Sequence, residues 1–116
     1  MKDTIQELTD RIIKFRDARD WRQFHNPKDV AISLSLEAAE LLEHFQWKDE
    51  AAAARHLRSA KEHVSDELAD VLYWVLLLAH DLGIDIRRAA LRKLRKNAAK
   101  YPVRKARGRS AKYDKL

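Results

Sequence analysis

Residues 66–83, DELADVLYWVLLLAHDLG, decide how this chain folds. From Val71 to Ala79 almost every side chain is apolar, which is typical of a helix that touches protein on most of its faces. Gly83 is expected to end this helix, because glycine readily adopts the left-handed conformation found at helix stops. Three carboxylates stand at the front of the stretch, where burial is costly without a proton, a cationic partner or a metal ion.

Composition favours an all-helical protein. The chain has 116 residues with two glycines, two prolines and no cysteine, a length that allows one hydrophobic core and a composition typical of helices. The lack of cysteine excludes disulfides and thiolate metal sites and agrees with a reducing compartment. No apolar run is long enough to span a membrane, and the N-terminus lacks the apolar segment of a secretory signal. We therefore expect a cytoplasmic protein without a membrane partner.

Start signals and apolar spacing predict four main helices and one short one. Thr4 with Glu7 forms a capping box, Asn26 is a favourable cap, Ser59 begins another capping box and Asp85 can cap a last helix. The predicted helices cover residues 4–20, 26–47, 50–57, 59–83 and 85–100. The expected fold is all-α, a four-main-helix bundle at residues 1–103 followed by a basic tail at residues 104–116.

Charge is divided unevenly along the chain, whose formal net charge is +6. Residues 1–86 carry 11 Lys and Arg against 17 Asp and Glu, whereas residues 87–116 carry 13 Lys and Arg against one acid, Asp114. Such segregation indicates that the acids serve a cation and the bases serve an anion.

Four of the acids form two pairs at helical spacing. Glu37 and Glu40 share one face of the second helix, and Glu67 and Asp70 share one face of the long helix. If these helices pack side by side, four carboxylates converge and repel one another. Oxygen ligands suit hard cations, so the pattern predicts a Mg²⁺ or Mn²⁺ site. A single pair of this kind is usually a solvated helix face, and that alternative stays open.

A metal–polyphosphate compound is the natural partner of such a site, because Mg²⁺ keeps water and substrate phosphates in its shell. Lys93, Asn97 and Lys100 share one face of the last helix and can bind phosphate oxygens, although basic residues there are often merely solvated. Trp21 and Trp47 flank loops, where a large aromatic side chain often contacts a ligand or a subunit.

Several segments resemble a known family. The acid pairs EAAE (37–40) and DELAD (66–70) resemble the signature of the MazG-type all-α nucleoside triphosphate pyrophosphohydrolases. RDWRQFHNP (19–27), LLEHFQW (41–47) and YPV with KARGRSAKY (101–113) resemble its dCTP pyrophosphatase branch. The resemblance covers most of the chain, although Asp66 stands where the wider family often has a second Glu.

The resemblance implies an enzyme that cleaves a nucleoside triphosphate, dCTP or a modified dCTP, to the monophosphate and pyrophosphate, as nucleotide-pool housecleaning. It implies that the four paired acids bind Mg²⁺, and that a glutamate or a water on the metal delivers the attacking hydroxide. The residues that it places at the base and phosphate sites are Trp21, His25, Trp47, Trp74, Lys93, Asn97 and Tyr101.

The long helix carries more apolar surface than three partner helices can cover. Leu76, Leu77 and Leu78 would then form an exposed patch of the kind that marks an interface, so we expect a homo-oligomer. The resemblance implies a dimer or a tetramer.

Two other functions compete with hydrolysis. The basic C-terminal region fits a nucleic-acid-binding helical protein, but that function leaves the four acids without a role. A di-iron bundle protein usually needs Glu-x-x-His pairs on two helices, and neither acid pair is followed by a histidine at that spacing. Nucleotide hydrolysis is therefore the leading prediction.

Overall fold

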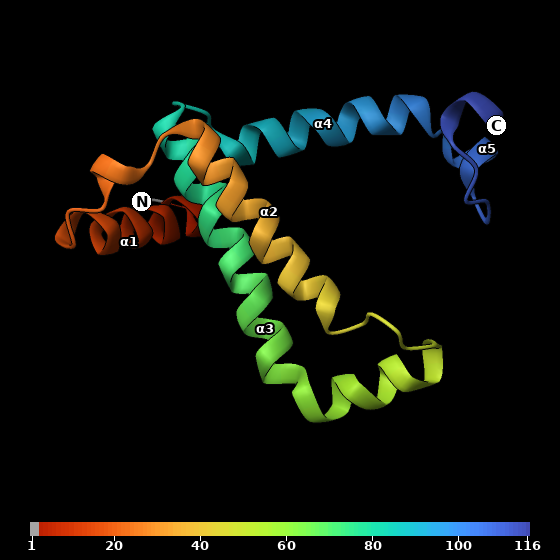
Figure 1. The fold of residues 1–116 in the computed structure, drawn as a ribbon. Coiled ribbons are helices and arrows are strands. Elements are labelled where there is room, and N and C mark those ends of the chain that lie inside the picture. Colours follow the sequence, from red (N-terminus) through yellow and green to blue (C-terminus); the bar gives the residue numbers. More distant parts are fainter. Residues whose placement is uncertain (1–2) are drawn as a thin grey trace. The chain divides into compact units, whose positions relative to one another are not determined.

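The computed structural model describes residues 3–116, which form helices, turns and loops with no strand among them (Figure 1). The all-α prediction is thus confirmed. The helices are α1 (Thr4–Ala18), α2 (Pro27–Glu43), α3 (Glu50–Asp81), α4 (Ile86–Lys100) and α5 (Val103–Ala106), with 3-10 turns η1 (Arg22–Phe24) and η2 (Tyr113–Lys115). None of the described helices is both long and apolar enough to cross a membrane.

The chain separates into two compact units. The first ends at Gly83 and contains α1, η1, α2 and α3, and the second runs from Ile84 to Leu116. The predicted boundary at residue 103 stays a prediction, because compactness alone does not define a folding domain.

Each of the four long helices begins at a side-chain cap. Asp3, Asn26, Asp49 and Asp85 each accept a hydrogen bond from the backbone amide three residues further on, which satisfies one of the free donors of the first turn. The predicted caps Asn26 and Asp85 are confirmed. Thr4 is the first residue of α1, as predicted, but its predicted capping role was wrong, because the carboxylate of Asp3 takes the capping position.

Helix α3 joins two segments that were predicted as separate helices. It bends at Ala60, whose φ of −116° and ψ of 19° are not helical. The Ser59 hydroxyl donates to the carbonyl of His56 at 3.1 Å, so it occupies the acceptor of the helical ladder instead of capping a new helix. Gly83 ends α3 with a φ of 67°, as predicted.

Helix α2 is shorter than predicted and ends at Glu43 instead of near Trp47. The residues that follow form a turn in which Trp47 has a φ of 65°. A right-handed helix requires a negative φ, so the helix cannot continue through Trp47, although the sequence there is apolar. A positive φ is uncommon for a bulky residue, which is why the sequence did not predict this turn.

In the first unit, α3 packs against both α2 and α1, and α2 and α3 lie side by side (Figure 1). Leu77 and Val30 are 0% and 1% exposed, and Leu76 is also buried. The prediction that Leu76, Leu77 and Leu78 form an exposed patch was therefore wrong for the first two, and Leu78 is half-buried. The other two helices of the unit cover this end of α3.

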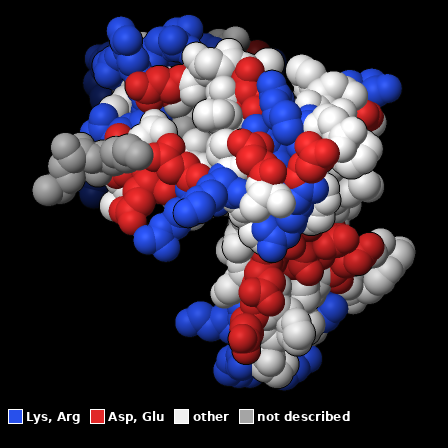
Figure 2. Space-filling model, turned by 90° about the vertical axis from the view of Figure 1, so that its left-hand side faces the viewer, with Lys and Arg blue, Asp and Glu red and all other residues white. Residues whose placement is uncertain are grey.

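A different set of apolar side chains is exposed. Leu36 and Leu42 on α2 are 60% and 65% exposed, and Leu68 on α3 is 54% exposed. The face of the molecule drawn in Figure 2 carries both acidic and basic side chains with uncharged surface between them. Contiguous apolar patches are typical of surfaces that meet another protein, whereas single exposed apolar side chains are common on any protein surface.

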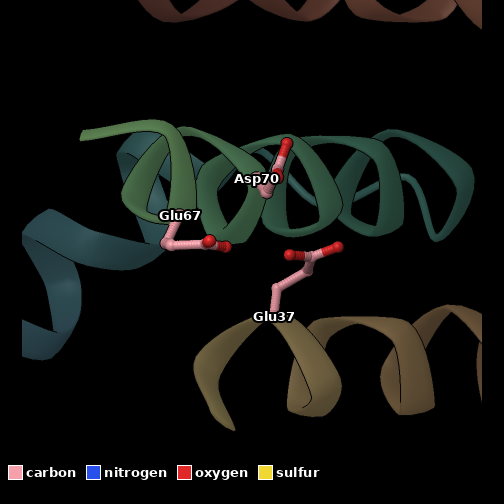
Figure 3. Close-up of side chains that lie close together, drawn as sticks. All are labelled: Glu37, Glu67 and Asp70. Carbon is pink, nitrogen blue, oxygen red and sulfur yellow. The ribbon is translucent and has the colours of Figure 1, made fainter. Parts of the chain in front are cut away.

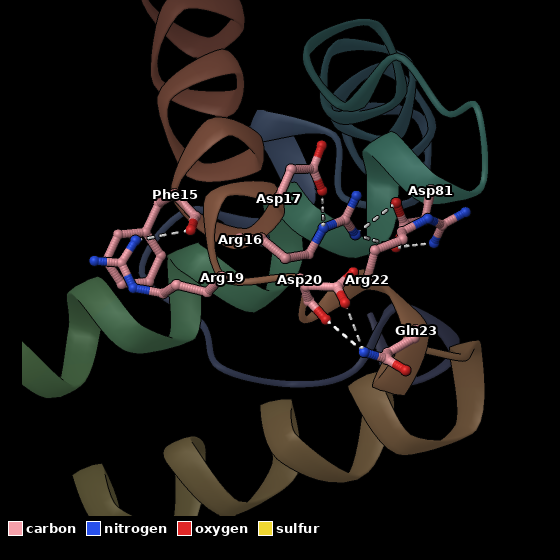
Figure 4. Close-up of polar contacts among 8 residues, drawn as sticks. All are labelled: Phe15, Arg16, Asp17, Arg19, Asp20, Arg22, Gln23 and Asp81. Atoms are coloured by element: carbon pink, nitrogen blue, oxygen red, sulfur yellow. Dashed lines mark hydrogen bonds and ion pairs between the residues drawn. The ribbon is translucent and has the colours of Figure 1, made fainter.

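A buried ion pair joins α1 to the end of α3. The guanidinium of Arg16, 2% exposed, donates to both carboxylate oxygens of Asp81 at 2.9 and 2.8 Å and to Asp17 at 3.1 Å (Figure 4). Burial tends to lower the pKa of Arg16, but its bonds to these two acids outweigh burial and raise it. Arg22 of η1 also reaches Asp81, at 2.9 Å. The loop after α1 is thereby fixed to α3.

The second unit is built around α4. Beyond this helix, Tyr101 meets Tyr113 edge to face with ring centroids 6.1 Å apart. The ammonium of Lys100 lies 4.9 Å from the centre of the Tyr113 ring, a distance at which a cation is attracted to an aromatic face. These contacts hold the C-terminal segment onto the end of α4.

Candidate metal and nucleotide site

Three carboxylates converge between two helices of the first unit. Glu37 comes from α2, and Glu67 and Asp70 come from α3 (Figure 3). Each offers one carboxylate oxygen, and these oxygens lie within 4.8 Å of one another. The i, i+3 spacing puts Glu67 and Asp70 on one side of α3, and the side-by-side packing of the helices brings Glu37 opposite them.

The cluster lacks internal positive charge. One carboxylate oxygen of Glu37 and one of Glu67, both Oε2, are buried and have no hydrogen-bond partner in the described part of the chain. The pKa of Glu37 rises from 4.5 to about 7, first because the carboxyl is shielded from water and then because Asp70 and Glu40 are negatively charged neighbours. Such a site favours either a proton or a cation.

Glu40, the fourth predicted ligand, lies outside this set of three. Its side chain is exposed, and it contacts both neighbouring glutamates. The close approach of Glu40 is the largest cause of the raised pKa of Glu67, followed by burial. Glu40 therefore adds negative charge at the edge of the cluster.

Two histidines border the cluster on one side. His44 caps the C-terminus of α2, and its Nδ1 lies 2.9 Å from Nε2 of His56 on α3. Nε2 of His44 lies 3.9 Å from Oε1 of Glu67. The pKa of His56 is lowered, first by burial and then by the positive charge of Lys48. A cavity of about 320 Å³ opens beside them, lined by Glu40, Glu43, His44, Lys48, His56 and Glu67.

Two of the predicted base-binding side chains meet. The rings of His25 and Trp74 are edge to face with centroids 5.4 Å apart. Nδ1 of His25 is buried without a hydrogen-bond partner among the described residues. Burial, followed by the charge of Arg16, lowers the pKa of His25, which favours the neutral ring. A flat apolar face beside an unpaired ring nitrogen is a surface on which a nucleobase can bind.

The remaining predicted residues divide between the two units. Trp21 packs edge to face on Phe15 at 5.8 Å, and Trp47 is 93% exposed in the turn after α2. Lys93, Asn97 and Tyr101 belong to α4 and its C-cap in the second unit. Their roles remain predictions.

The MazG-like family model matches residues 32–116, a span that contains all three converging carboxylates. The chain belongs to the MazG-like family. It is also 36% identical to dCTP pyrophosphatase 1 of Rattus norvegicus over 97% of its length and 68% of that protein, and 35% identical to dCTP pyrophosphatase 1 of Homo sapiens with the same coverage.

A solved structure shares the fold. The crystal structure of a pyrophosphatase from Archaeoglobus fulgidus superposes with a TM-score of 0.82 and 41% identity, covering 88% of this chain and 95% of the other. With these relatives, this MazG-like chain is a nucleotide pyrophosphohydrolase.

Two contacts of this MazG-like chain were missed from the sequence. Arg16 and Asp81 are 65 residues apart and look like ordinary surface charges on amphipathic helices. His56 sits in a segment that was predicted as a separate short helix, so its contact with His44 could not be foreseen. The sequence did carry one signal for His44: it follows Glu40 by one helical turn and so shares the face of the acid pair.

Proposed function

We propose that the enzyme uses Mg²⁺ to hydrolyse dCTP or a modified dCTP to the monophosphate and pyrophosphate, as a housecleaning activity on the nucleotide pool. The convergence of Glu37, Glu67 and Asp70 carries this proposal. The names of the relatives, dCTP pyrophosphatase 1, support the choice of nucleotide.

The residues present fit a hard divalent cation. The set offers oxygen donors alone, two buried carboxylate oxygens have no other partner in the described chain, and the neighbouring negative charges need neutralising. Mg²⁺ and Mn²⁺ prefer such ligands. Glu37, Glu67 and Asp70 would hold the ion, with Glu40 beside them. When bound, the ion supplies positive charge to the phosphate oxygens of the substrate.

The chain itself binds and orients the nucleotide. His25 and Trp74 offer the base an aromatic surface next to a neutral ring nitrogen. Trp21, Trp47, Lys93, Asn97 and Tyr101 complete the proposed base and phosphate contacts. Phosphoryl transfer depends mainly on positioning and charge neutralisation, which these residue types provide.

The reaction balances with one water. Its oxygen bonds to the α-phosphorus, and the bond between that phosphorus and the oxygen bridging to the β-phosphate breaks, so pyrophosphate leaves. A glutamate of the cluster accepts the proton of the water.

Each canonical dNTP and NTP should be incubated with the protein and Mg²⁺, and the products separated. We expect dCTP to yield dCMP and pyrophosphate in equal amounts, and Glu67→Gln to lower kcat by about 100-fold or more. Glu62→Gln, an exposed acid on the same helix, is the matched control and should retain activity. Release of orthophosphate instead of pyrophosphate would contradict the cleavage position.

A further inference from the structure

The imidazole of His44 lies between the carboxylate cluster and His56. Its Nδ1 is 2.9 Å from His56, and its Nε2, on the other side of the ring, is 3.9 Å from Oε1 of Glu67. The two ring nitrogens therefore have different neighbours, a histidine nitrogen and a carboxylate oxygen. The second oxygen of Glu67, Oε2, is buried and has no hydrogen-bond partner within residues 3–116, so it is available to a cation.

These contacts select one tautomer of His44. In a bond between two neutral imidazoles, one nitrogen donates and the other accepts. If His44 donated through Nδ1, the lone pair of its Nε2 would face a carboxylate oxygen and repel it. If His56 donates instead, His44 carries its proton on Nε2 and presents an N–H to Glu67. The negative charge of Glu67 favours this second arrangement.

The ring of His44 is held from two helices. Its backbone caps α2 and bonds to the carbonyls of Leu41 and Leu42, and its side chain is tied to the segment of α3 before the bend at Ala60. Glu67 lies on α3 after that bend. At 3.9 Å the N–H is outside hydrogen-bond distance, and a shift of about 1 Å in the Glu67 side chain closes the bond.

We propose that His44 is a positioning residue, which presents its Nε2 proton to Oε1 of Glu67 and so leaves Oε2 oriented toward the metal, while His56 fixes the tautomer. This inference rests on the proposed function, in which Glu67 binds the cation. Residues that orient metal-binding carboxylates commonly change metal affinity by about 10–100-fold when removed.

Three variants of one position separate positioning from simple packing. Gln places an amide N–H near the place of Nε2, whereas Asn places its amide near Nδ1 and Leu offers no donor. The binding of Mn²⁺ without nucleotide is followed by electron paramagnetic resonance of the free ion. We expect His44→Leu and His44→Asn to weaken Mn²⁺ binding about 10-fold or more, and His44→Gln to stay within about threefold of the parent.

His80→Leu is the matched control, because His80 is an exposed histidine near the end of α3; it should leave Mn²⁺ affinity unchanged. Circular dichroism confirms that each variant is folded. Equal weakening of Mn²⁺ binding by Leu, Asn and Gln at position 44 would overturn the inference. If His44 acted only by packing, the Mn²⁺ affinity would not depend on where the side chain carries its N–H donor.

The tautomer is measured on the unmodified protein, so the inference can fail even if every variant unfolds. Long-range ¹H–¹⁵N NMR at mildly alkaline pH, without metal, should show the proton of His44 on Nε2. A proton on Nδ1 would overturn the inference.

Failure of the proposed function and failure of the inference about His44 give different results. If Glu67→Gln leaves Mn²⁺ binding unchanged, the proposed function fails. If Glu67→Gln weakens it and His44→Leu does not, only the role of His44 fails.

Discussion

Glu37 connects the stability of the metal-free protein to pH. Its pKa is about 7 in the folded chain, against an ordinary 4.5. Between these values the folded protein binds a proton that the unfolded chain has released. The free energy of unfolding should therefore fall as pH rises from about 4.5 to about 7 and show no further loss from this group above that.

Urea unfolding with a chelator present, repeated across this pH range, measures the effect. Glu37→Gln should flatten the fall, because the amide cannot titrate, and saturating Mg²⁺ should do the same in the parent by replacing the proton. Glu62→Gln serves as the exposed control. A slope that persists unchanged in Glu37→Gln would assign the pH dependence to other groups.

Trp74 gives a prediction about nucleotide affinity. Its ring lies against His25 at a centroid distance of 5.4 Å, and a stacked base is worth about 1–3 kcal/mol. Trp74→Leu keeps apolar volume but removes the aromatic face, so KM for dCTP should rise about fivefold or more. Mn²⁺ affinity in the absence of nucleotide should stay unchanged. A loss of Mn²⁺ affinity would show that Trp74 supports the cluster and not the base.

At the residue scale, spacing predicted much of the candidate site. The i, i+3 spacing puts the acids of each pair on one helix face, so the sequence predicted that the two pairs converge if their helices pack side by side. Glu37, Glu67 and Asp70 do meet, and Glu40 lies outside this set. His56 was missed because its contact with His44 depends on how the chain turns after α2, and turns are set by a few backbone angles, such as the positive φ at Trp47, that leave little trace in the sequence.

At the scale of elements, the buried pair between α1 and α3 should dominate stability. The side chains of Arg16 and Asp81 are 2% and 9% exposed. Removing one partner leaves an uncompensated buried charge, so Asp81→Asn should lower the free energy of unfolding by about 3–5 kcal/mol.

Chemical denaturation checks this value against Glu7→Gln, which removes an exposed pair with Arg11 and should cost less than about 1 kcal/mol. Equal effects of the two substitutions would contradict a special role for the buried pair.

Because Asp81 also binds Arg22, Asp81→Asn should loosen the loop that carries Trp21 and His25 and raise KM for dCTP.

Helix starts were easier to predict than helix continuity. Asn26 and Asp85 are local signals, since a cap acts on an amide three residues away. The joining of two predicted helices into α3 was not foreseen, because the Ser59–Glu62 pattern is a capping box in sequence, whereas the hydroxyl of Ser59 bonds backward to His56. The tertiary packing of α3 decides whether Ser59 caps a new helix or bonds backward within a continuous one.

At the scale of the whole molecule, the exposed leucines of α2 and α3 predict self-association. Leu36 and Leu68 are 60% and 54% exposed, and covering such side chains is favourable by about 25 cal/mol for each Å². We propose a homodimer or a tetramer. Size-exclusion chromatography with light scattering should give a multiple of 13.6 kDa, and Leu36→Glu with Leu68→Glu should shift it toward the monomer. An active monomer in the parent protein would contradict this proposal.

The roles of three residues could not be tested by sequence patterns: Lys93, Asn97 and Tyr101. Helical spacing places Lys93 and Asn97 on one face of α4, but a pattern within one helix carries no information about the distance to a cluster on two others. The basic charge of the second unit was evident from composition alone, whereas the partner of that charge depends on tertiary and quaternary arrangement.

The pairing of Arg16 with Asp81 has a consequence for synthesis in the cell. The two residues are 65 positions apart, so Arg16 leaves the ribosome long before Asp81 is translated. The guanidinium of Arg16 therefore stays hydrated, and α1 cannot dock onto α3 through this ion pair, until α3 is complete. Nascent chains stalled before residue 81 should remain sensitive to protease, and protection should arise abruptly once this acid emerges.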